Sequence, residues 1–285
     1  MLRFLHIPKT AGTSFKLYIQ KSFPEERFIE FAGHLEKDHR IYERIEGGRL
    51  RPRLVGGHAA IRTGISEIDE LPTITFLREP IARVRSFCRH VAEGKSPYLL
   101  NSVPPSQFSL KRFLESGNFE LCNLQTAMLT PGWNYHEKGQ FHSNNIARAF
   151  EMLSERCVAF GLLEYLPESI FLISRETGLP LKRISRANSS SNVLHLVWSE
   201  KDLQTAKNLN AADIKLYEQA EQLFFHRLKE LSLLTSIHLC LFRLHWKLTE
   251  RLINSFYKFR SIWGRRIRRI LTRNNDDSAR RASSQ

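Results

Sequence analysis

Two stretches of the chain share one plan, in which a short apolar run leads through a polar turn with a proline into a helical segment. The first is FLHIPKTAGTS at residues 4–14, and the second is TITFLREPIARVRSFCRHV at residues 73–91. Short apolar runs that are bounded by turn signals are typical of buried strands. Strands that alternate with helices predict an α/β fold with a central, mainly parallel sheet flanked by helices.

The turn in the first stretch has the residue types of an anion-binding site. Lys9 adds a positive charge, and the hydroxyls of Thr10, Thr13 and Ser14 add hydrogen-bond donors. A helix that opens near Gly12 would direct its free N–H groups toward the turn. The nucleotide P-loop has glycines before its lysine, an order that this turn lacks, so we discount an ATPase or GTPase. An ordinary strand-to-helix turn capped by Thr or Ser is the alternative.

The second stretch places Arg78 at the end of its strand and Ser86 eight residues later, two turns along the following helix. Ligands of open α/β sheets bind outside the carboxyl ends of the strands. Two such ends with anion-binding groups would face one crevice. They could hold both phosphorylated ends of a nucleotide.

The pair HIPKTAGTS and FLREPIARVRSF resembles the two signatures of the Golgi-type carbohydrate sulfotransferases and their bacterial relatives. This family includes the heparan sulfate 2-O- and 6-O-sulfotransferases. The resemblance implies a P-loop-like three-layer fold that binds 3'-phosphoadenosine 5'-phosphosulfate (PAPS), with the 5'-phosphosulfate at the first motif and the 3'-phosphate at the second. By position, it assigns the cofactor site to Lys9, Thr10, Gly12, Thr13, Ser14, Arg78 and Ser86, with Arg186 and Ser190 in a loop over the cofactor.

Weaker similarities extend the match. Residues 123–129 are similar to the helix that packs under the site in that family, and residues 160–164 resemble the strand that follows. The loop over the cofactor corresponds to residues 186–191. Together, the resemblance covers residues 2–228.

Sulfuryl transfer needs a group that stabilises the leaving oxygen and a base that takes the acceptor's proton. Lys9 is the natural candidate for the first role, since an ammonium at a helix end can follow the developing charge. The resemblance suggests His58 as the base, because some members place a catalytic His after a Gly between the two motifs. A His that caps a strand end is the alternative reading of His58, and His34, His39 and Glu36 are the other candidate bases.

Helical periodicity continues through the rest of the chain. A buried strand is expected at residues 157–160, and Ser199 followed by Asp202 marks a helix start. The expected helices span residues 106–115, 120–129, 146–155, 167–177 and 211–231.

The C-terminal part carries most of the positive charge. Residues 236–285 hold twelve Lys or Arg and three acidic residues, a balance of +9 out of the total +14. We expect a sulfotransferase domain at 1–232, a basic amphipathic helical extension at 233–273 and a disordered tail at 274–285. The extension has three alternatives: packing on its own domain, peripheral contact with an anionic membrane through 237–272, or docking on a partner. It cannot span a bilayer, because charges interrupt it too often.

Other features limit the function. The four cysteines form no C-x-x-C pair and no H-E-x-x-H is present, so no metal site is expected. A chain with neither a signal segment nor a membrane anchor is expected to be cytoplasmic, with peripheral contact at the inner membrane surface if the tail binds lipid. The resemblance favours an acceptor hydroxyl on a carbohydrate or glycolipid, while small metabolites and peptide tyrosines stay open. A P-loop-like kinase, a nucleic-acid-binding protein and a non-catalytic protein on a sulfotransferase fold are the rival classes.

Overall fold

The computed structural model divides the chain into two compact units, Met1–Leu231 and Ser232–Gln285. The structure describes residues 1–22, 28–31, 35–50, 52–57, 66–131, 143–184, 194–253 and 255.

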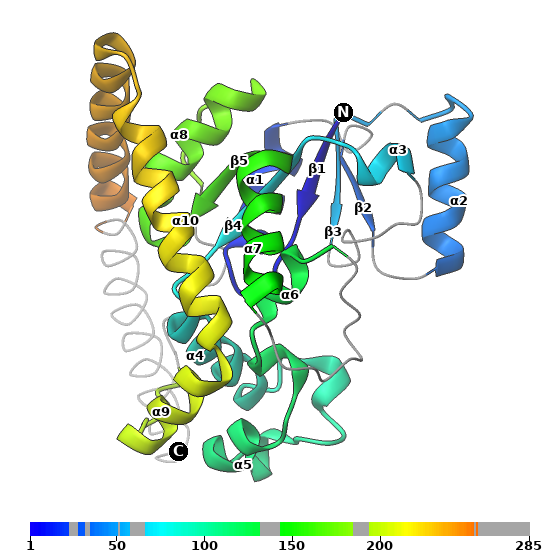
Figure 1. Ribbon diagram of the computed structural model, residues 1–285, viewed down its shortest axis with the longest axis vertical. Coiled ribbons are helices and arrows are strands. Elements are labelled where there is room, and N and C mark those ends of the chain that lie inside the picture. The colour runs from blue at the N-terminus through cyan, green and yellow to red at the C-terminus, as the bar shows by residue number, and fades with distance from the viewer. Residues whose placement is uncertain are drawn as a thin grey trace, which may run out of the picture. The chain divides into compact units, whose positions relative to one another are not determined.

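The strands of the first unit are short and form one parallel sheet (Figure 1). They are β1 (Leu2–Leu5), β2 (Phe28–Phe31), β3 (Leu54–Gly57), β4 (Thr73–Leu77) and β5 (Cys157–Leu162). Their order across the sheet is β2-β3-β1-β4-β5. The connection from β1 to β2 runs toward one edge of the sheet, and the connection from β4 to β5 runs toward the opposite edge. In open α/β sheets, ligands bind at the carboxyl ends of the strands where the connections diverge in this way. Here that point lies between β1 and β4.

Helices and short helical turns connect the strands. They are α1 (Gly12–Ser22), α2 (Leu35–Glu46), α3 (Ser66–Asp69), α4 (Pro80–Ala92), η2 (Pro97–Leu99), η3 (Pro105–Gln107), α5 (Leu110–Glu115), η4 (Phe119–Leu121), α6 (Leu124–Leu129), α7 (Ser143–Glu151), the π-helical turn η5 (Met152–Arg156), η6 (Leu163–Tyr165), α8 (Leu166–Thr177), α9 (Glu200–Leu209) and α10 (Ala211–Lys229).

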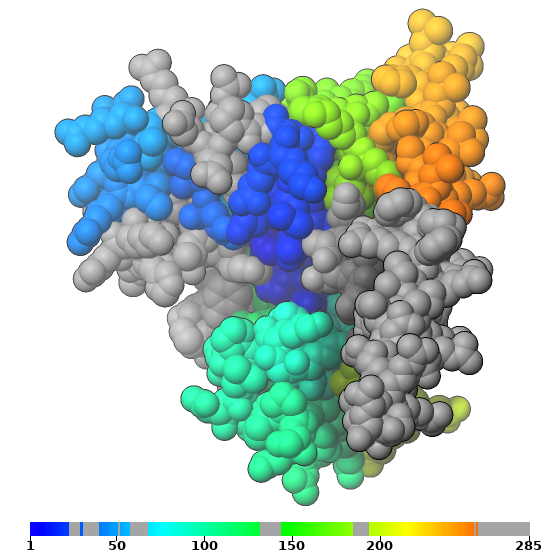
Figure 2. Space-filling model, turned by 180° about the vertical axis from the view of Figure 1, so that it is seen from behind, coloured from blue at the N-terminus to red at the C-terminus, as the bar shows by residue number. Residues whose placement is uncertain are grey.

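One face of the sheet is covered by α1 and α8. The Phe15 ring of α1 packs against Phe4 of β1 and Phe76 of β4, with ring centroids 4.7 and 5.1 Å away. Gly161 of β5 lies on the same face, where a Cβ would be 2.4 Å from the Phe76 ring and 2.8 Å from Cβ of Ser169 in α8. Figure 2 shows α1 in dark blue on this face. The glycine therefore lets α8 approach the sheet closely.

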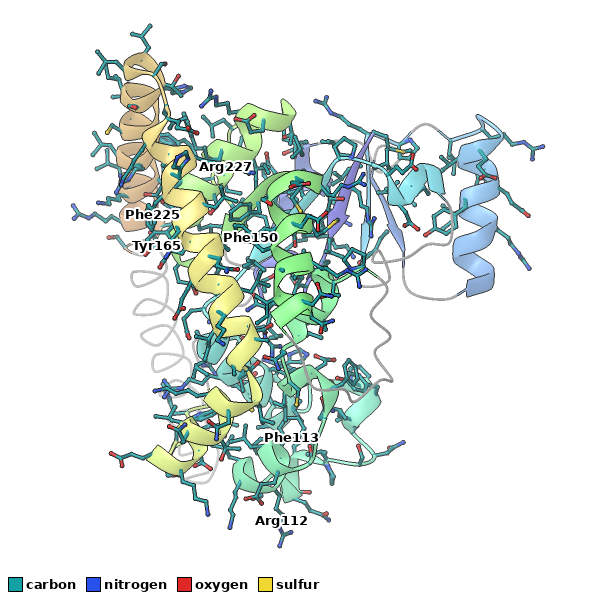
Figure 3. All side chains as sticks on the ribbon, viewed as in Figure 1. Arg112, Phe113, Phe150, Tyr165, Phe225 and Arg227 are labelled. Carbon is teal, nitrogen blue, oxygen red and sulfur yellow. The ribbon has the colours of Figure 1, made fainter. Side chains whose placement is uncertain are left out.

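The opposite face is covered by α10, with α7 beside it (Figure 1). The Phe224 ring of α10 lies 6.1 Å from the Phe160 ring of β5, and the Arg227 guanidinium lies 5.2 Å from the same ring. Tyr165 and Phe225 meet edge to face at 4.9 Å nearby (Figure 3). The parallel sheet is thus flanked by helices on both faces, which confirms the expected α/β class.

Local signals in the sequence are also confirmed. The buried strand expected at 157–160 is part of β5. Ser199 and Asp202 form a capping box at the start of α9, in which the Ser199 hydroxyl accepts the Asp202 N–H at 3.1 Å and Asp202 Oδ2 accepts the Ser199 N–H at 3.0 Å. This reciprocal bonding satisfies two N–H groups at the helix start.

Two expected helices are shorter than their periodicity suggests. The helix expected at 106–115 begins only after Ser109, whose side chain accepts the N–H of Arg112 at 3.5 Å. The helix expected at 120–129 is divided into η4 and α6, because Asn123 between them has a φ of 45°. A left-handed residue ends a right-handed helical run, which accounts for the division at Asn123. The first helix is shorter because its N-cap is Ser109, which has an extended backbone, and residues 105–107 form the separate turn η3.

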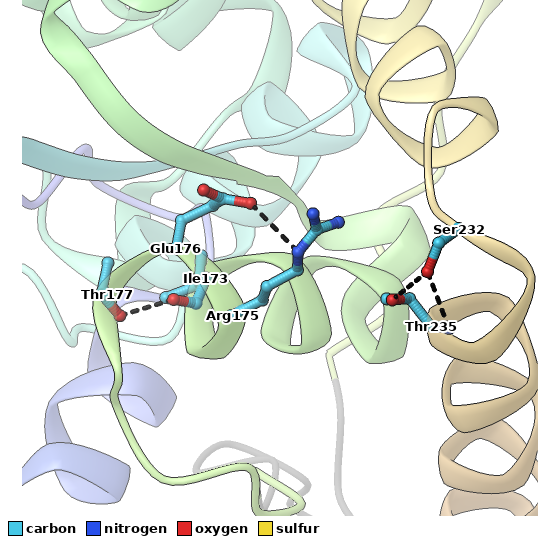
Figure 4. Close-up of polar contacts among 6 residues, drawn as sticks. All are labelled: Ile173, Arg175, Glu176, Thr177, Ser232 and Thr235. Atoms are coloured by element: carbon cyan, nitrogen blue, oxygen red, sulfur yellow. Dashed lines mark hydrogen bonds and ion pairs between the residues drawn. The ribbon is translucent and has the colours of Figure 1, made fainter.

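The described part of the second unit is a helix over residues 233–253. Its start is capped by Ser232, whose hydroxyl contacts the Thr235 hydroxyl at 2.8 Å and accepts the Thr235 N–H at 3.4 Å (Figure 4). Across the described ranges, no helix has both the length and the apolar character that are needed to cross a membrane.

Candidate functional site

The turn between β1 and α1 has an unusual backbone. Lys9 has a φ of 69° and Ala11 a φ of 83°, values that residues other than glycine rarely adopt. Thr10 lies between them, 1% exposed, and its hydroxyl donates to the carbonyl of Ile7 at 2.9 Å. Residues of alternating handedness direct successive N–H groups into one concavity that binds anions. Such strain costs free energy and is found where a ligand site needs it.

The helix after this turn opens at Gly12, as the sequence predicts. Its first bond is between the Phe15 N–H and the Ala11 carbonyl at 3.0 Å, so the earlier N–H groups have no partner within the helix. A Cβ at position 12 would lie 1.7 Å from Nε2 of His6. A larger side chain at this position would therefore have to displace the imidazole that is packed against Gly12. Thr13 is exposed and Ser14 half-buried at the same helix start.

The second turn, between β4 and α4, has its helix N-terminus already occupied by carboxylates. Glu79 caps α4, and its side chain accepts the N–H groups of Ile81 at 2.9 Å and Ala82 at 2.6 Å. The N–H of Glu79 in turn donates to Glu164 Oε1 at 3.0 Å. These donors are therefore not free for an anion, and an anion at this turn would have to contact side chains such as those of Arg78 and Ser86.

Arg78 joins the two turns. Its Nη1, at the end of β4, donates to the Lys9 carbonyl in the turn after the neighbouring β1 at 3.2 Å. Its backbone is held by the Gln125 side chain, which accepts the Arg78 N–H and donates to the Arg78 carbonyl, both at 2.9 Å. Arg78 Nε is buried and has no hydrogen-bond partner in the described part of the chain. A buried donor without a partner is costly, and an incoming anion would satisfy it.

The helix starts of α6 and α10 are joined by reciprocal hydrogen bonds, and Gln125, which holds Arg78, belongs to the first of them. The fully buried Asp213 of α10 accepts the N–H groups of Gln125 at 3.1 Å and Thr126 at 2.7 Å, both in the first turn of α6. Asn123, which caps α6, accepts the N–H groups of Ala212 and Asp213 at 2.9 and 3.1 Å. Each helix therefore caps the other, and the pair fixes Gln125 and through it Arg78.

The environment of Lys9 weakens its hold on a proton. Burial lowers the Lys9 pKa from 10.5 to about 8, and the neighbouring Arg78 guanidinium adds to that effect. Glu120 and Glu93 oppose it, while Lys95 acts in the same direction as Arg78. Burial also lowers the Arg78 pKa, against the attraction of Glu164. Two partly buried cations side by side favour a bound anion.

Two further groups, which were not predicted from the sequence, lie near Lys9. His90 is one helical turn after Ser86 on α4, and its pKa is lowered by burial and then by the charges of Lys9 and Lys95. The buried carboxyl of Glu120 accepts the Tyr98 hydroxyl, and burial raises its pKa against the pull of Arg83 and Lys9. The four-residue spacing from Ser86 to His90 could have indicated the imidazole. No local pattern marks Glu120.

The remaining predicted site residues are His58, Arg186 and Ser190, with His34, His39 and Glu36 as other candidate bases. His58, Arg186, Ser190 and His34 lie outside the described residues, while His39 and Glu36 are described only as part of α2. β3 is described up to Gly57, whose carbonyl accepts the His6 N–H at 3.4 Å.

The described chain on both sides of residues 185–193 is attached to the site's helices. Before them, the carbonyl of Pro180 accepts the hydroxyl of Tyr18 from α1. After them, the N–H of Leu194 donates to Glu93 at 3.3 Å, next to α4. The described residues that flank 185–193 therefore contact α1 on one side and the C-terminal end of α4 on the other.

Figure 2 shows residues 1–22 in dark blue above the turquoise surface of η2, η3 and α5.

Within the described ranges, no group of three or more His, Cys, Asp or Glu side chains is placed to hold a metal ion. No protein-family model matches the chain, and no curated protein matches it.

Proposed function

We propose that the protein is a PAPS-dependent sulfotransferase, which moves a sulfuryl group to an acceptor hydroxyl. The observation that carries this proposal is the hydrogen bond of Arg78 to the Lys9 carbonyl. It joins two anion-binding turns on neighbouring strands, and a nucleotide phosphorylated at both ends needs two such turns. The resemblance of both turns to the sulfotransferase signatures selects this nucleotide among others.

The described residues fit such a ligand. The strained turn from Lys9 to Ala11 and the start of α1 would hold the 5'-phosphosulfate, through N–H groups and the hydroxyls of Thr13 and Ser14. The Nε of Arg78, which has no hydrogen-bond partner among the described residues, would bind the 3'-phosphate. The resemblance adds Ser86 at that phosphate, with Arg186 and Ser190 over the nucleotide.

The bound PAPS would supply an activated sulfuryl group. Lys9 would stabilise the negative charge on the leaving oxygen, since its half-buried ammonium belongs to the turn just before α1. Its lowered pKa makes it a better proton donor than an ordinary lysine. The resemblance implies that the transfer is in-line and independent of metal.

The base that accepts the acceptor's proton is proposed to be His58. His90 is the second candidate, because its imidazole lies near Lys9 and its lowered pKa keeps it neutral at neutral pH. Glu120 is less suited, since its carboxyl is buried and accepts the Tyr98 hydroxyl. Parallel His58→Ala and His90→Ala variants separate the two, because the base variant should bind the nucleotide normally and lose transfer.

The finer parts of the proposal concern fold and location. A phosphate-binding turn between the central strand β1 and α1 supports a P-loop-like three-layer fold. The helix at 233–253 is proposed to begin a basic extension that continues to residue 273. All four cysteines are free thiols, which suits a reducing compartment such as the cytoplasm. The acceptor is proposed to be a carbohydrate or glycolipid hydroxyl.

Titration calorimetry with 3'-phosphoadenosine 5'-phosphate tests the proposal. Wild type should bind, and Arg78→Ala should weaken binding by roughly 10- to 100-fold, because a charge-assisted phosphate contact contributes about 1.5–3 kcal/mol. Arg112→Ala is the matched control, since Arg112 is exposed on α5 away from the turns (Figure 3). Absence of binding by wild type would refute the proposal.

A transfer assay separates an enzyme from a non-catalytic binding protein. Radiolabelled sulfate should pass from PAPS into a fraction of host lipid, polysaccharide or small metabolites. Lys9→Ala should reduce turnover far more than it weakens nucleotide binding, because the lysine acts on the leaving group. Nucleotide binding without any transfer would indicate a binding protein on the same fold.

A further inference from the structure

The helix at residues 233–253 has two apolar faces, and only one of them is buried. Leu239, Phe242 and Trp246 are buried, and the Phe242 and Trp246 rings meet edge to face at 5.7 Å. The other face is exposed, with side chains 49% to 79% accessible. We call it the outer stripe, and its members are Leu234, Ile237, Leu241, Leu244, Leu248 and Leu252.

The outer stripe follows the helical repeat for its whole length. Its members are separated by three or four residues, so they form one continuous line along the helix. A continuous exposed line of large apolar side chains indicates an interaction surface.

A line of positive charge runs beside the outer stripe. Arg243, Lys247 and Arg251 are four residues apart and lie along one side of it, and all three are exposed. Glu250 is the only acidic residue in this described helix. Apolar side chains flanked by exposed cations are suited to an interface that is apolar inside and negatively charged at its rim.

The outer stripe and the adjacent cations together favour one partner for this surface over another. In an antiparallel pair, a second copy of the helix would place its own row of cations beside these, and pairs of like charge oppose such an assembly. An anionic lipid surface complements both features at once, since acyl chains accept the leucines and headgroups accept the cations. We propose that the outer stripe of residues 234–252 lies on the surface of a membrane that contains anionic lipid.

Co-sedimentation of the full chain with vesicles tests this. Wild type should bind vesicles of phosphatidylcholine mixed with phosphatidylserine, and should bind phosphatidylcholine alone far more weakly. Replacing Arg243, Lys247 and Arg251 with Gln should lower the partition coefficient by roughly 100-fold, at about fivefold for each charge. Leu241→Gln with Leu248→Gln should lower it by at least about tenfold, because two buried leucine side chains are lost.

Two control variants match these changes in number and type. Lys201, Lys207 and Lys215 are exposed lysines of α9 and α10, and their replacement with Gln should leave most of the binding intact. Leu194→Gln with Val197→Gln replaces exposed apolar residues of the first unit and should not change it. The thermal unfolding midpoint of each variant should match wild type, since every substituted side chain is exposed.

Three results would overturn the proposal. The first is wild type that does not sediment with anionic vesicles. The second is unchanged binding by the Leu241 and Leu248 variant, which would indicate a purely electrostatic contact with any polyanion, nucleic acid included. The third is a dimer in light scattering that becomes monomeric with the same variant, which would assign the outer stripe to a second copy. Each result is independent of nucleotide binding, so the proposed sulfotransferase activity is tested separately.

Discussion

Replacement of Lys9 with Met should stabilise the nucleotide-free protein while it removes activity. The Lys9 ammonium is partly buried beside Arg78, and its pKa falls from 10.5 to about 8 in the folded chain. Folding therefore costs free energy whenever this lysine must stay charged. A methionine has a similar length and no charge, so it avoids that cost.

The size of the effect follows from the shift. Each pKa unit corresponds to about 1.4 kcal/mol, so the difference between 10.5 and about 8 corresponds to about 3 kcal/mol at neutral pH. For a domain of this size, about 1 kcal/mol raises the midpoint of thermal unfolding by roughly 2–4 °C. Lys9→Met should therefore raise the midpoint by roughly 6–12 °C as an upper value.

The gain must depend on pH. Because the folded pKa is below the unfolded one, the full stability of wild type is reached above the unfolded value of 10.5 and is lost as pH falls through about 8. The advantage of the Met variant should thus be largest at neutral pH. It should shrink between about pH 8 and pH 10.5 and nearly vanish above that.

Differential scanning calorimetry of both proteins across this pH range measures the effect. Lys21→Met is the control, because Lys21 is an exposed lysine at the end of the same helix and its loss should change little. A Met variant that is no more stable than wild type at neutral pH would refute the reasoning, and so would a gain that does not change with pH. Adding 3'-phosphoadenosine 5'-phosphate should stabilise wild type more than the variant.

Other changes test other parts of the fold. Gly12→Ala should abolish nucleotide binding in calorimetry, because the new methyl group would lie 1.7 Å from Nε2 of His6. Adding His6→Ala should restore part of the binding, since it removes the imidazole. A double variant that binds no better than Gly12→Ala would contradict this contact. Asp213→Asn should lower the free energy of unfolding, measured in urea, by about 2–4 kcal/mol, since the buried carboxylate that caps α6 loses its charge. A loss below about 1 kcal/mol would argue against the reciprocal capping of α6 and α10. Iodoacetamide should label the exposed Cys240 in the native protein and spare Cys88, whose pKa is raised by burial to about 12. Mass spectrometry measures the labelling of each cysteine. Equal labelling of both would show that Cys88 is accessible.

Much of the site could be predicted because its parts are local in the chain. The apolar run before Lys9, the small residue at Gly12 and the proline after Arg78 each favour one conformation over a few residues, and the structure shows those elements. The capping box at Ser199 is equally local. Such preferences are encoded within about one helical turn, so a single sequence displays them.

The contacts between these parts could not be predicted in the same way. Asp213 lies 88 residues from Gln125, and no periodicity indicates that one caps the helix of the other. Glu120 lies far from Lys9 in sequence, and its effect on the lysine's pKa follows only from folding. The expected helix at 120–129 is divided at Asn123, whose side chain accepts the N–H groups of Ala212 and Asp213 at the start of α10.

The sequence by itself determined that two strand-turn-helix units exist and that their turns carry residue types suited to binding an anion, because backbone preference and residue chemistry are local properties. Only the tertiary structure decided that β1 and β4 are neighbours, with Arg78 bonded to the Lys9 carbonyl. Strand order depends on burying both faces of the sheet at once, which involves residues from the whole first unit. That packing brings two turns together as one candidate site, with a partly buried lysine and an arginine Nε that has no hydrogen-bond partner among the described residues.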